Sequence, residues 1–439
     1  MRNLQTGQAM SQKTITRREQ LQLLLLGASA PVIYGISSLI RMTGRVLPEK
    51  NGEFSHIQSY RALGGTGLKV SDVGFGVSCS IDPQLMVNGY RRGINYFDIS
   101  PMFTWSVEML AEAFARDAGM KRDAVVASKI ESMGIVDTVK CMDVLGRGGA
   151  FNACVVCIDK TLKKLGRSHI DILQIHGVGQ NGAGDLDWLD PNTARGSGAQ
   201  ELFTLLKRQG KVRFTGITSH GPSLLDEVAE KCAGNGSFDA MMLALNFMKP
   251  PSPALGQTLG AAGLRGMGIT AMKVLANGQN AEPRPGGGRR LSHAAISWAL
   301  SQPGVSNMVI TIDSPKTLNE YISASGRKLT SSDLSMLQMH CDATSGQYCR
   351  VDCGQCNRAC PNGVDIATIL RIDQYRSNYR QREMARERYM AFDGRKRLTA
   401  CLDCQDPVCE INCPFGLPVR ARLQLAYLQL DPGGDEAPA

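Results

Sequence analysis

The segment LGRSHIDILQIHGV, residues 165–178, joins a helix-like stretch to a strand-like one. Residues 152–166, NACVVCIDKTLKKLG, place apolar side chains at three-to-four spacing, which is typical of a helix packed on one face. Cys154 and Cys157 in this stretch are interpreted as packing residues. Asp171–Gly177 is a short apolar, β-branched run, as in a buried strand. A helix followed at once by a buried strand predicts an α/β fold.

The same alternation continues from about residue 60 to about residue 325. Strand-like runs are separated by helix-length segments such as SVEMLAEAFARDAG at residues 106–119. Eight such runs predict a parallel (β/α)8 barrel over residues 58–328. The runs are Leu68–Gly76, Tyr96–Ser100, Ala124–Ile130, Asp171–Gly177, Val212–Ser219, Ala240–Phe247, Gly268–Val274 and Asn307–Thr311.

Length and composition leave room for further domains. The chain has 439 residues, of which 43% are apolar and 20% charged, and a net charge of +9. The arginine-rich stretch 371–397 is interpreted as a solvated helix face, so no nucleic-acid partner is expected. Eight of the 14 cysteines crowd into residues 349–413. This clustering indicates metal ligands rather than a disulfide framework.

The eight clustered cysteines form two runs, each ending in Cys-Pro. The first is C-x3-C-x2-C-x3-C-P and the second is C-x2-C-x4-C-x3-C-P. Short loops that end in a proline turn can bring four thiolates onto one cubane, whereas tetrahedral zinc sites would not explain a Cys-Pro at each end. The runs therefore predict two 4Fe–4S clusters in a mainly helical domain, residues 335–430, with Cys341 as a bystander. The expected ligands are Cys349, Cys353, Cys356, Cys360, Cys401, Cys404, Cys409 and Cys413.

The second run, CLDCQDPVCEINCP at residues 401–414, resembles the ligand runs of multi-cluster iron–sulfur electron-transfer subunits. In ferredoxins, the fourth cysteine of each run binds the other cluster. This resemblance implies one group of Cys349, Cys353, Cys356 and Cys413, and another of Cys401, Cys404, Cys409 and Cys360. The helix between the runs could instead separate them into two self-contained sites.

The amino-acid sequences of the predicted strands also contain distinctive motifs. YRALGGTGLKVSDVGFG (60–76), GINYFDISP (93–101), LGRSHIDILQIHGV, GKVRFTGITSHG (210–221) and GMGITAMKVLANG (266–278) resemble the successive signatures of the aldo-keto reductase superfamily. Members of this family are (β/α)8 barrels that transfer hydride from NADPH to a carbonyl. The resemblance implies catalytic roles for Asp98, Lys129 and His176.

The catalytic tyrosine of that family falls on Phe103 in this sequence. Carbonyl reduction needs a proton donor, and phenylalanine has none. Losing a general acid typically lowers the reaction rate by a factor of about 10²–10⁴. Tyr96 is expected to lie deeper in the barrel on the same strand face and is no obvious substitute. Asp98 and Lys129 would then survive as a buried ion pair, which is costly to break from one side.

The nicotinamide-binding positions of the family are only partly present. The family commonly uses a Ser-Asn pair and a Gln for the amide, with an aromatic ring stacked on the nicotinamide. The strand after KVRFTGI offers Thr218, Ser219 and His220. We take Ser219 and Asn246 as the candidate cofactor-binding residues that remain.

Other cofactor positions have changed their chemistry. The Gln position is Met242 and the stacking position is Leu245. The phosphate loop has Thr311 where glycine is usual and Asp313 where arginine is usual. A carboxylate beside a phosphate costs at least ~1 kcal/mol even in a water-like dielectric. Together these losses put NADPH binding in doubt.

The first 50 residues resemble a twin-arginine export signal followed by a membrane segment. Thr16–Gln22 contains the Arg-Arg pair, with Gln20 at the usual phenylalanine. No charge follows until Arg41, and twenty helical residues at ~1.5 Å rise span a bilayer core. Ala28–Ala30 resembles a cleavage site, but Pro31 usually blocks cleavage. An uncleaved hydrophobic anchor helix is therefore favoured over a removed signal peptide or a buried amphipathic helix.

Three functions are consistent with these features. The first is an exported, membrane-anchored electron-transfer protein at the periplasmic face, with two 4Fe–4S clusters and redox protein partners. The second is an active oxidoreductase that reduces a carbonyl or quinone with electrons from the clusters. The third is a non-catalytic subunit of a respiratory or photosynthetic assembly. The eroded NADPH positions favour the first function over the second.

Overall fold

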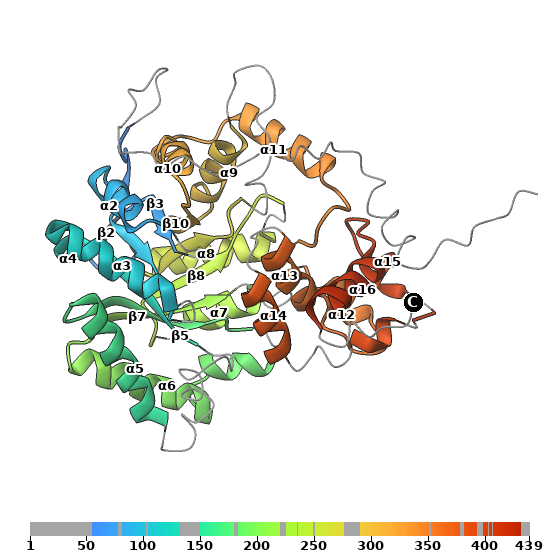
Figure 1. Ribbon diagram of the computed structural model, residues 1–439, viewed down its shortest axis with the longest axis horizontal. Coiled ribbons are helices and arrows are strands. Elements are labelled where there is room, and N and C mark those ends of the chain that lie inside the picture. The colour runs from blue at the N-terminus through green and yellow to red at the C-terminus, as the bar shows by residue number, and fades with distance from the viewer. Residues whose placement is uncertain are drawn as a thin grey trace, which may run out of the picture.

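Eight parallel strands close into a barrel in the order β10-β3-β4-β5-β6-β7-β8-β9 (Figure 1). The predicted eight-stranded parallel barrel is confirmed. The strands are β3 (Val73–Gly76), β4 (Tyr96–Asp98), β5 (Val125–Glu131), β6 (Ile170–His176), β7 (Val212–Ser219), β8 (Ala240–Ala244), β9 (Gly268–Met272) and β10 (Val305–Thr311). The computed structural model describes residues 55–77, 81–101, 104–131, 150–179, 183–219, 225–234, 236–248, 251–275, 290–350, 353–377, 382–392, 398–402, 404–405 and 407–431.

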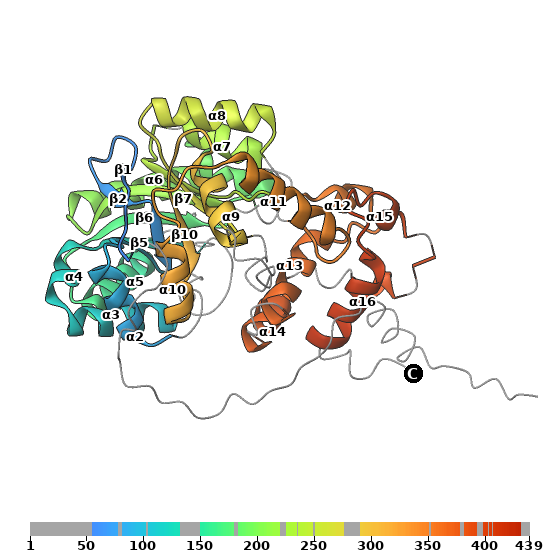
Figure 2. The same cartoon turned by 90° about the horizontal axis from the view of Figure 1, so that it is seen from above.

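Helices follow the strands and cover the outside of the barrel (Figures 1 and 2). Several begin at a side chain that caps free backbone N–H groups, as Ser252 does for α8 and Ser314 for α10. These helices are α2 (Pro83–Arg91), α3 (Thr104–Arg116), α4 (Ala118–Asp123), α5 (Ala150–Leu165), the 3-10 helix η3 (Ala183–Leu189), α6 (Ala194–Arg208), α7 (Leu225–Gly234), α8 (Pro253–Leu264), α9 (Leu291–Leu300) and α10 (Pro315–Ile322).

A hairpin closes the amino end of the barrel. Strands β1 (Tyr60–Ala62) and β2 (Lys69–Ser71) pair antiparallel, and their connection buries Leu63 and Leu68 among the inward-facing side chains. Gly64 has φ +53°, and a Cβ there would lie 2.3 Å from the Gly266 carbonyl oxygen. Glycine is therefore required where the hairpin meets the loop before β9.

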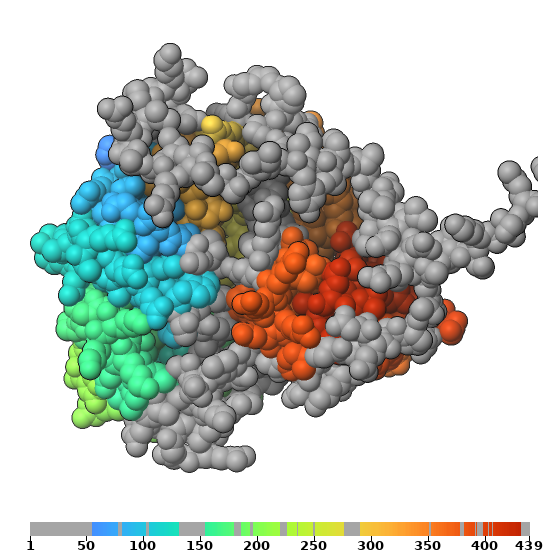
Figure 3. All heavy atoms as spheres, in the orientation of Figure 1, coloured from blue at the N-terminus to red at the C-terminus, as the bar shows by residue number. Residues whose placement is uncertain are grey.

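The C-terminal helices have an apolar core of their own. Helix α11 (Ser331–Ala343) packs on α9 and adds Leu337 to the barrel core. A second core begins with Cys356 and runs to Leu430. Figures 2 and 3 show these later helices gathered at one side of the barrel. They are α12 (Gln355–Ala359), α13 (Ile366–Ser377), α14 (Arg382–Ala391), α15 (Val408–Ile411) and α16 (Val419–Leu430).

The C-terminal region meets the barrel at the carboxyl ends of β8 and β9. His340 on α11 lies edge-on to Phe247, with ring centroids 5.9 Å apart. The Cys341 sulfur lies 3.7 Å from the Met248 sulfur. Lys273, directly after β9, reaches the ring of Tyr375 on α13. Active sites of such barrels are formed at this end, so the C-terminal helices adjoin the candidate site.

The expected twin-arginine signal and anchor, residues 1–50, lie outside the described residues. Within the described part of the chain, no helix is both long enough and apolar enough to cross a bilayer.

Candidate functional site

Asp98 and Lys129 form an ion pair at the carboxyl end of neighbouring strands. Asp98 is the last residue of β4, and Lys129 lies near the end of β5. The Lys129 Nζ atom lies 2.5 Å from Asp98 Oδ1 and also donates to the Ile99 carbonyl oxygen at 3.0 Å. Both side chains are largely buried, with 6% and 14% exposed. Each charge is compensated by the other, which such burial requires.

His176 is the last residue of β6 and stands opposite Glu131 of β5 in the register. The barrel therefore brings Asp98, Lys129 and His176 to one end of three consecutive strands. The fourth family position, Phe103, falls outside the described residues, as does His220.

Tyr96 faces the barrel interior among apolar side chains. Burial and the nearby Asp98 raise the pKa of its phenol above the ordinary value of 10. A phenol so shifted holds its proton tightly at neutral pH and would be a poor proton donor.

The candidate cofactor-binding residues make hydrogen bonds within the protein. The Ser219 hydroxyl, at the end of β7, donates to the Val178 carbonyl oxygen at 2.7 Å. Asn246, just after β8, accepts the backbone N–H of Met248 on Oδ1 at 3.1 Å. Both side chains are buried, so these polar atoms already serve the turns that hold them.

Met242 and Leu245 are apolar and buried in different layers. Met242 faces the barrel interior, whereas Leu245 packs in the layer between strands and helices. Leu245 is 2% exposed and offers no surface on which a ring could stack.

The start of α10 lies where the family's phosphate loop was expected. Ser314 Oγ accepts the Thr317 backbone N–H at 3.2 Å, and Asp313 Oδ1 accepts the Thr317 hydroxyl at 2.9 Å. A helix N-terminus attracts anions through free N–H groups and its dipole. Here a side chain already caps one of these groups, and an exposed carboxylate occupies the approach. The residues present do not fit a phosphate.

The C-terminal helices pack in pairs that join the two cysteine runs. Helix α12 packs on α15, and α13 packs on α16. Cys356 lies on α12 and Cys409 on α15, so the middle of one run meets the middle of the other.

Cysteines of the two runs lie close enough to interact electrostatically. Cys353, Cys356 and Cys413 lie close enough to Cys349 for their charges to raise the pKa of its thiol. Likewise Cys360, Cys409 and Cys404 act on Cys401. Cys356 also feels the charge of Cys409, so the charges of the two sets reach each other.

Burial disfavours thiolates at both groups. Burial first, and then neighbouring thiolates, raise the pKa values of Cys356 and Cys401 to about 12. Burial and the Glu410 charge contribute most to raising that of Cys409 to about 11. Metal ligation needs the thiolate, so a bound cationic centre would have to supply the missing compensation.

The two runs also share a turn that the sequence analysis missed. Each ends in Cys-Pro-x-Gly, at residues 360–363 and 413–416. Gly363 and Gly416 have φ +60° and +63°, and each N–H donates to the carbonyl oxygen of its cysteine at 3.1 Å. The repeated glycine was a readable signal, because only glycine adopts this conformation without strain. The C-terminal domain therefore contains two similar halves.

Within the described residues, no group of three or more His, Cys, Asp or Glu side chains is close enough to hold one metal ion. The thiolates of a cubane each bind a different iron, so they stand farther apart than ligands that share one ion.

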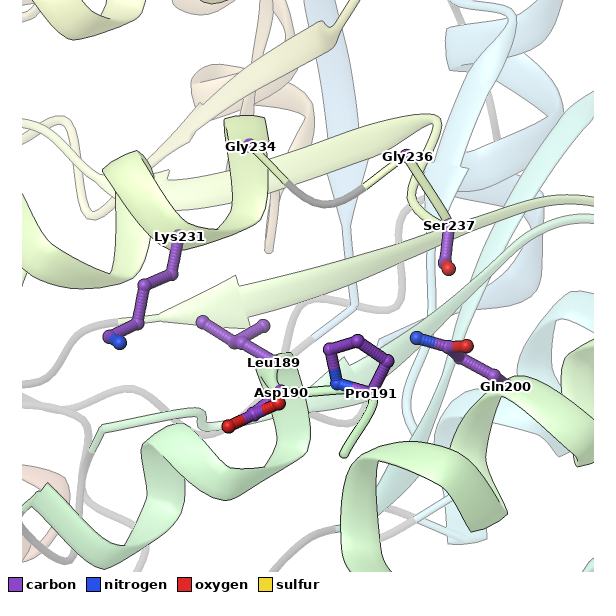
Figure 4. Close-up of a pocket in the computed structure, with 8 residues that line it drawn as sticks. All are labelled: Leu189, Asp190, Pro191, Gln200, Lys231, Gly234, Gly236 and Ser237. Carbon is purple, nitrogen blue, oxygen red and sulfur yellow. The ribbon is translucent and has the colours of Figure 1, made fainter. Parts of the chain in front are cut away.

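A separate pocket of about 420 Å³ lies on the outside of the barrel between η3, α6 and α7 (Figure 4). Asp190, Gln200 and Lys231 are among its lining residues, and none of the candidate site residues lines it.

Comparisons with known proteins agree with the barrel. The sequence model of the Aldo/keto reductase family matches residues 84–283. L-galactose dehydrogenase of Arabidopsis thaliana is 26% identical over 303 residues, 60% of this chain and 87% of that protein. Pyridoxal 4-dehydrogenase of Microbacterium luteolum is 23% identical over 319 residues, 60% of this chain and 91% of that protein.

Among solved structures, an aldo-keto reductase of Bacillus halodurans is 18% identical, with a TM-score of 0.46 over 65% of this chain and 96% of that chain. Residues 84–283 are thus similar to the Aldo/keto reductase family, in agreement with the eight-stranded parallel barrel.

Proposed function

We propose that this protein is an exported, membrane-anchored iron–sulfur electron-transfer protein, or such a subunit of a redox complex. Its aldo-keto reductase-like barrel has lost NADPH-dependent activity, and its partners are redox proteins. Two 4Fe–4S clusters in the C-terminal domain would supply one-electron transfer. Export and anchoring rest on residues 15–40 alone, which lie outside the described residues.

The crossed grouping of the cysteines carries the proposal. Eight cysteines in a short segment could share a domain without converging, but here α12 packs on α15 and α13 on α16. In this packing the charge of Cys413 acts on Cys349, and that of Cys360 acts on Cys401. Two interleaved sets of four thiols are the ligand set that two neighbouring cubanes need.

The surroundings of the cysteines also suit anionic clusters. The Leu417 N–H points at Cys413 Sγ from 3.4 Å. Arg371 lies near Cys349, and Arg420 lies near Cys401. Positive charge and N–H donors near the sulfurs stabilise added electrons and raise the reduction potential.

The barrel supports the second half of the proposal. Three contacts that the family makes with NADPH are missing here. The Ser219 hydroxyl is already hydrogen-bonded, Leu245 is buried and cannot stack on the nicotinamide ring, and the start of α10 carries a carboxylate rather than a phosphate-binding group. We therefore assign no hydride-transfer step to this barrel. Asp98 and Lys129 act as a structural ion pair.

Paired cysteine variants test the clusters and their crossing. Cys349→Ala/Cys413→Ala removes two ligands of one crossed site, so half of the iron and acid-labile sulfide should remain. The matched variant Cys349→Ala/Cys360→Ala removes one ligand from each crossed site. It should lose nearly all of the iron and nearly all of the acid-labile sulfide. The reverse result would show self-contained sites. Wild-type protein without 4Fe–4S signals in electron paramagnetic resonance (EPR) would refute the proposed function.

A further inference from the structure

A buried tyrosine surrounded by cations links the barrel to the C-terminal domain. Tyr375, on α13, is 7% exposed. The Lys273 Nζ atom lies 5.3 Å from the centroid of its ring, and the Arg388 guanidinium carbon lies 4.6 Å from it. Lys273 belongs to the barrel, whereas Arg388 belongs to α14. The phenol is therefore held by positive charges from both domains.

The backbone of Lys273 is strained in making this contact. Its φ is +58°, and among the described residues it is the one non-glycine residue with a positive φ. Such a conformation costs of order 1 kcal/mol or more and persists where the surroundings demand it. Lys273 directly follows β9, at the carboxyl end of the barrel. Strain at this position makes the lysine contact a candidate for a functional role.

Helix α13 also connects Tyr375 to one cysteine group. Gln374, the preceding residue, donates from Nε2 to the Cys349 carbonyl oxygen at 3.2 Å. Arg371, one turn earlier, feels the charges of both Tyr375 and Cys349. A charge added at the Cys349 group would therefore act on Arg371, which interacts with Tyr375, in a buried region where electrostatic interactions are weakly screened.

The charges that face Tyr375 come from three elements: Lys273 after β9, Arg371 on α13 and Arg388 on α14. Burial by itself raises the pKa of the phenol from its ordinary value of 10. The Lys273, Arg388 and Arg371 charges and a hydrogen bond with Lys273 outweigh burial and lower the pKa to about 7. The phenol therefore exchanges its proton in the neutral range, where tyrosine is ordinarily protonated.

We propose that Tyr375 is a redox-linked proton site, whose phenolate takes up one proton when an electron enters the adjacent group of Cys349, Cys353, Cys356 and Cys413. The inference rests on the proposed function, because an electron must be able to arrive there. One O–H bond forms on reduction and breaks on re-oxidation, the proton comes from solvent, and the electron comes from the redox partner. Added negative charge nearby favours the neutral phenol, which is the physical link.

Redox titration of the full-length holoprotein at several pH values tests this, with reduction followed by EPR. In the wild type, the midpoint potential of one cluster should fall as the pH rises above neutral, approaching the one-electron limit of about 59 mV per tenfold change in proton activity. Tyr375→Phe keeps the ring but removes the proton, so its potential should not change with pH. Tyr427→Phe, a partly buried tyrosine on α16, is the matched control and should keep the wild-type slope.

A second variant tests the effect of the Lys273 charge, and an optical measurement follows the protonation of Tyr375 directly. Lys273→Met removes one cation, so the onset of the slope should move to higher pH. The absorbance difference between wild type and Tyr375→Phe should show a phenolate that forms near neutral pH in the oxidised protein and at higher pH in the reduced protein. An unchanged slope in Tyr375→Phe would overturn this inference alone. Absence of any 4Fe–4S signal would overturn both it and the proposed function.

Discussion

The barrel mouth and the C-terminal domain differ in how completely the residues expected of each site are present. At the barrel mouth, the ion pair of Asp98 and Lys129 is intact, but the expected cofactor contacts are apolar, already bonded or of the wrong charge. In the C-terminal domain, all eight expected cysteines are present, and those of the two runs interact electrostatically. A buried ion pair can persist because breaking it destabilises the fold. The eight thiols, three buried and five partly buried, form no comparable ion pair, and metal binding is the role that we propose for them.

Removal of the iron should have the largest effect in this comparison. The second core includes Cys356, Cys401 and Cys409, so removing a bound cluster would remove metal–thiolate bonds from that core. Structural metal sites of this kind contribute about 10 kcal/mol or more to folding. Oxidation in the presence of a chelator should make α12–α16 exchange amide hydrogens rapidly, while the barrel strands stay protected. Equal protection before and after treatment would show that the cysteine groups are not metal centres.

Breaking the ion pair should have the next largest effect. Lys129→Met leaves the Asp98 carboxylate buried and uncompensated, and should lower the free energy of unfolding by about 3–5 kcal/mol. Lys129→Met/Asp98→Asn should recover much of the loss, since no charge is left unpaired. Urea unfolding, monitored by a spectroscopic signal from the barrel, measures the free energy of unfolding of both variants.

The matched control for that change is Lys164→Met. Lys164 pairs with Glu108 at the surface, where both side chains are about half exposed. Such pairs contribute about 0–1 kcal/mol to the free energy of unfolding, so this variant should have nearly the same free energy of unfolding as the wild type. If Lys129→Met were equally mild, the pair would have no structural role, and a catalytic role would become the better explanation.

The smallest effect is expected for NADPH. Titration into the wild-type protein should leave the nicotinamide fluorescence unchanged at micromolar concentrations. Asp313→Arg should improve binding about fivefold, because it removes a like-charge contact of about 1 kcal/mol. Phe103→Tyr should restore little reductase activity, since the phosphate contacts would still be missing. If the wild type bound NADPH at micromolar concentrations, the barrel mouth would have to be regarded as a functional reductase site.

Much of the fold could be predicted from local pattern. Each barrel strand lies at least partly within one of the eight apolar runs, because short β-branched runs between helices have few other solutions. The catalytic family positions could be aligned, because they sit at strand ends with distinctive neighbours. The left-handed glycine of each Cys-Pro-x-Gly turn was also readable but was overlooked.

Contacts between distant segments could not be predicted. The pairing of α12 with α15 brings the two cysteine runs together, whereas cysteine spacing allowed either arrangement. Nothing local to Lys273 or Tyr375 signals that they meet, because the contact depends on how the C-terminal helices seat against the barrel.

The sequence by itself determined the barrel, the inventory of cysteines and the departures from the cofactor-binding positions of the aldo-keto reductases, since periodicity and residue type are local properties. Only the tertiary structure decided which cysteines interact, the burial of the ion pair and the cations around Tyr375. Burial and charge proximity arise when remote segments pack together, and they set the pKa values and ligand groupings on which the chemistry depends.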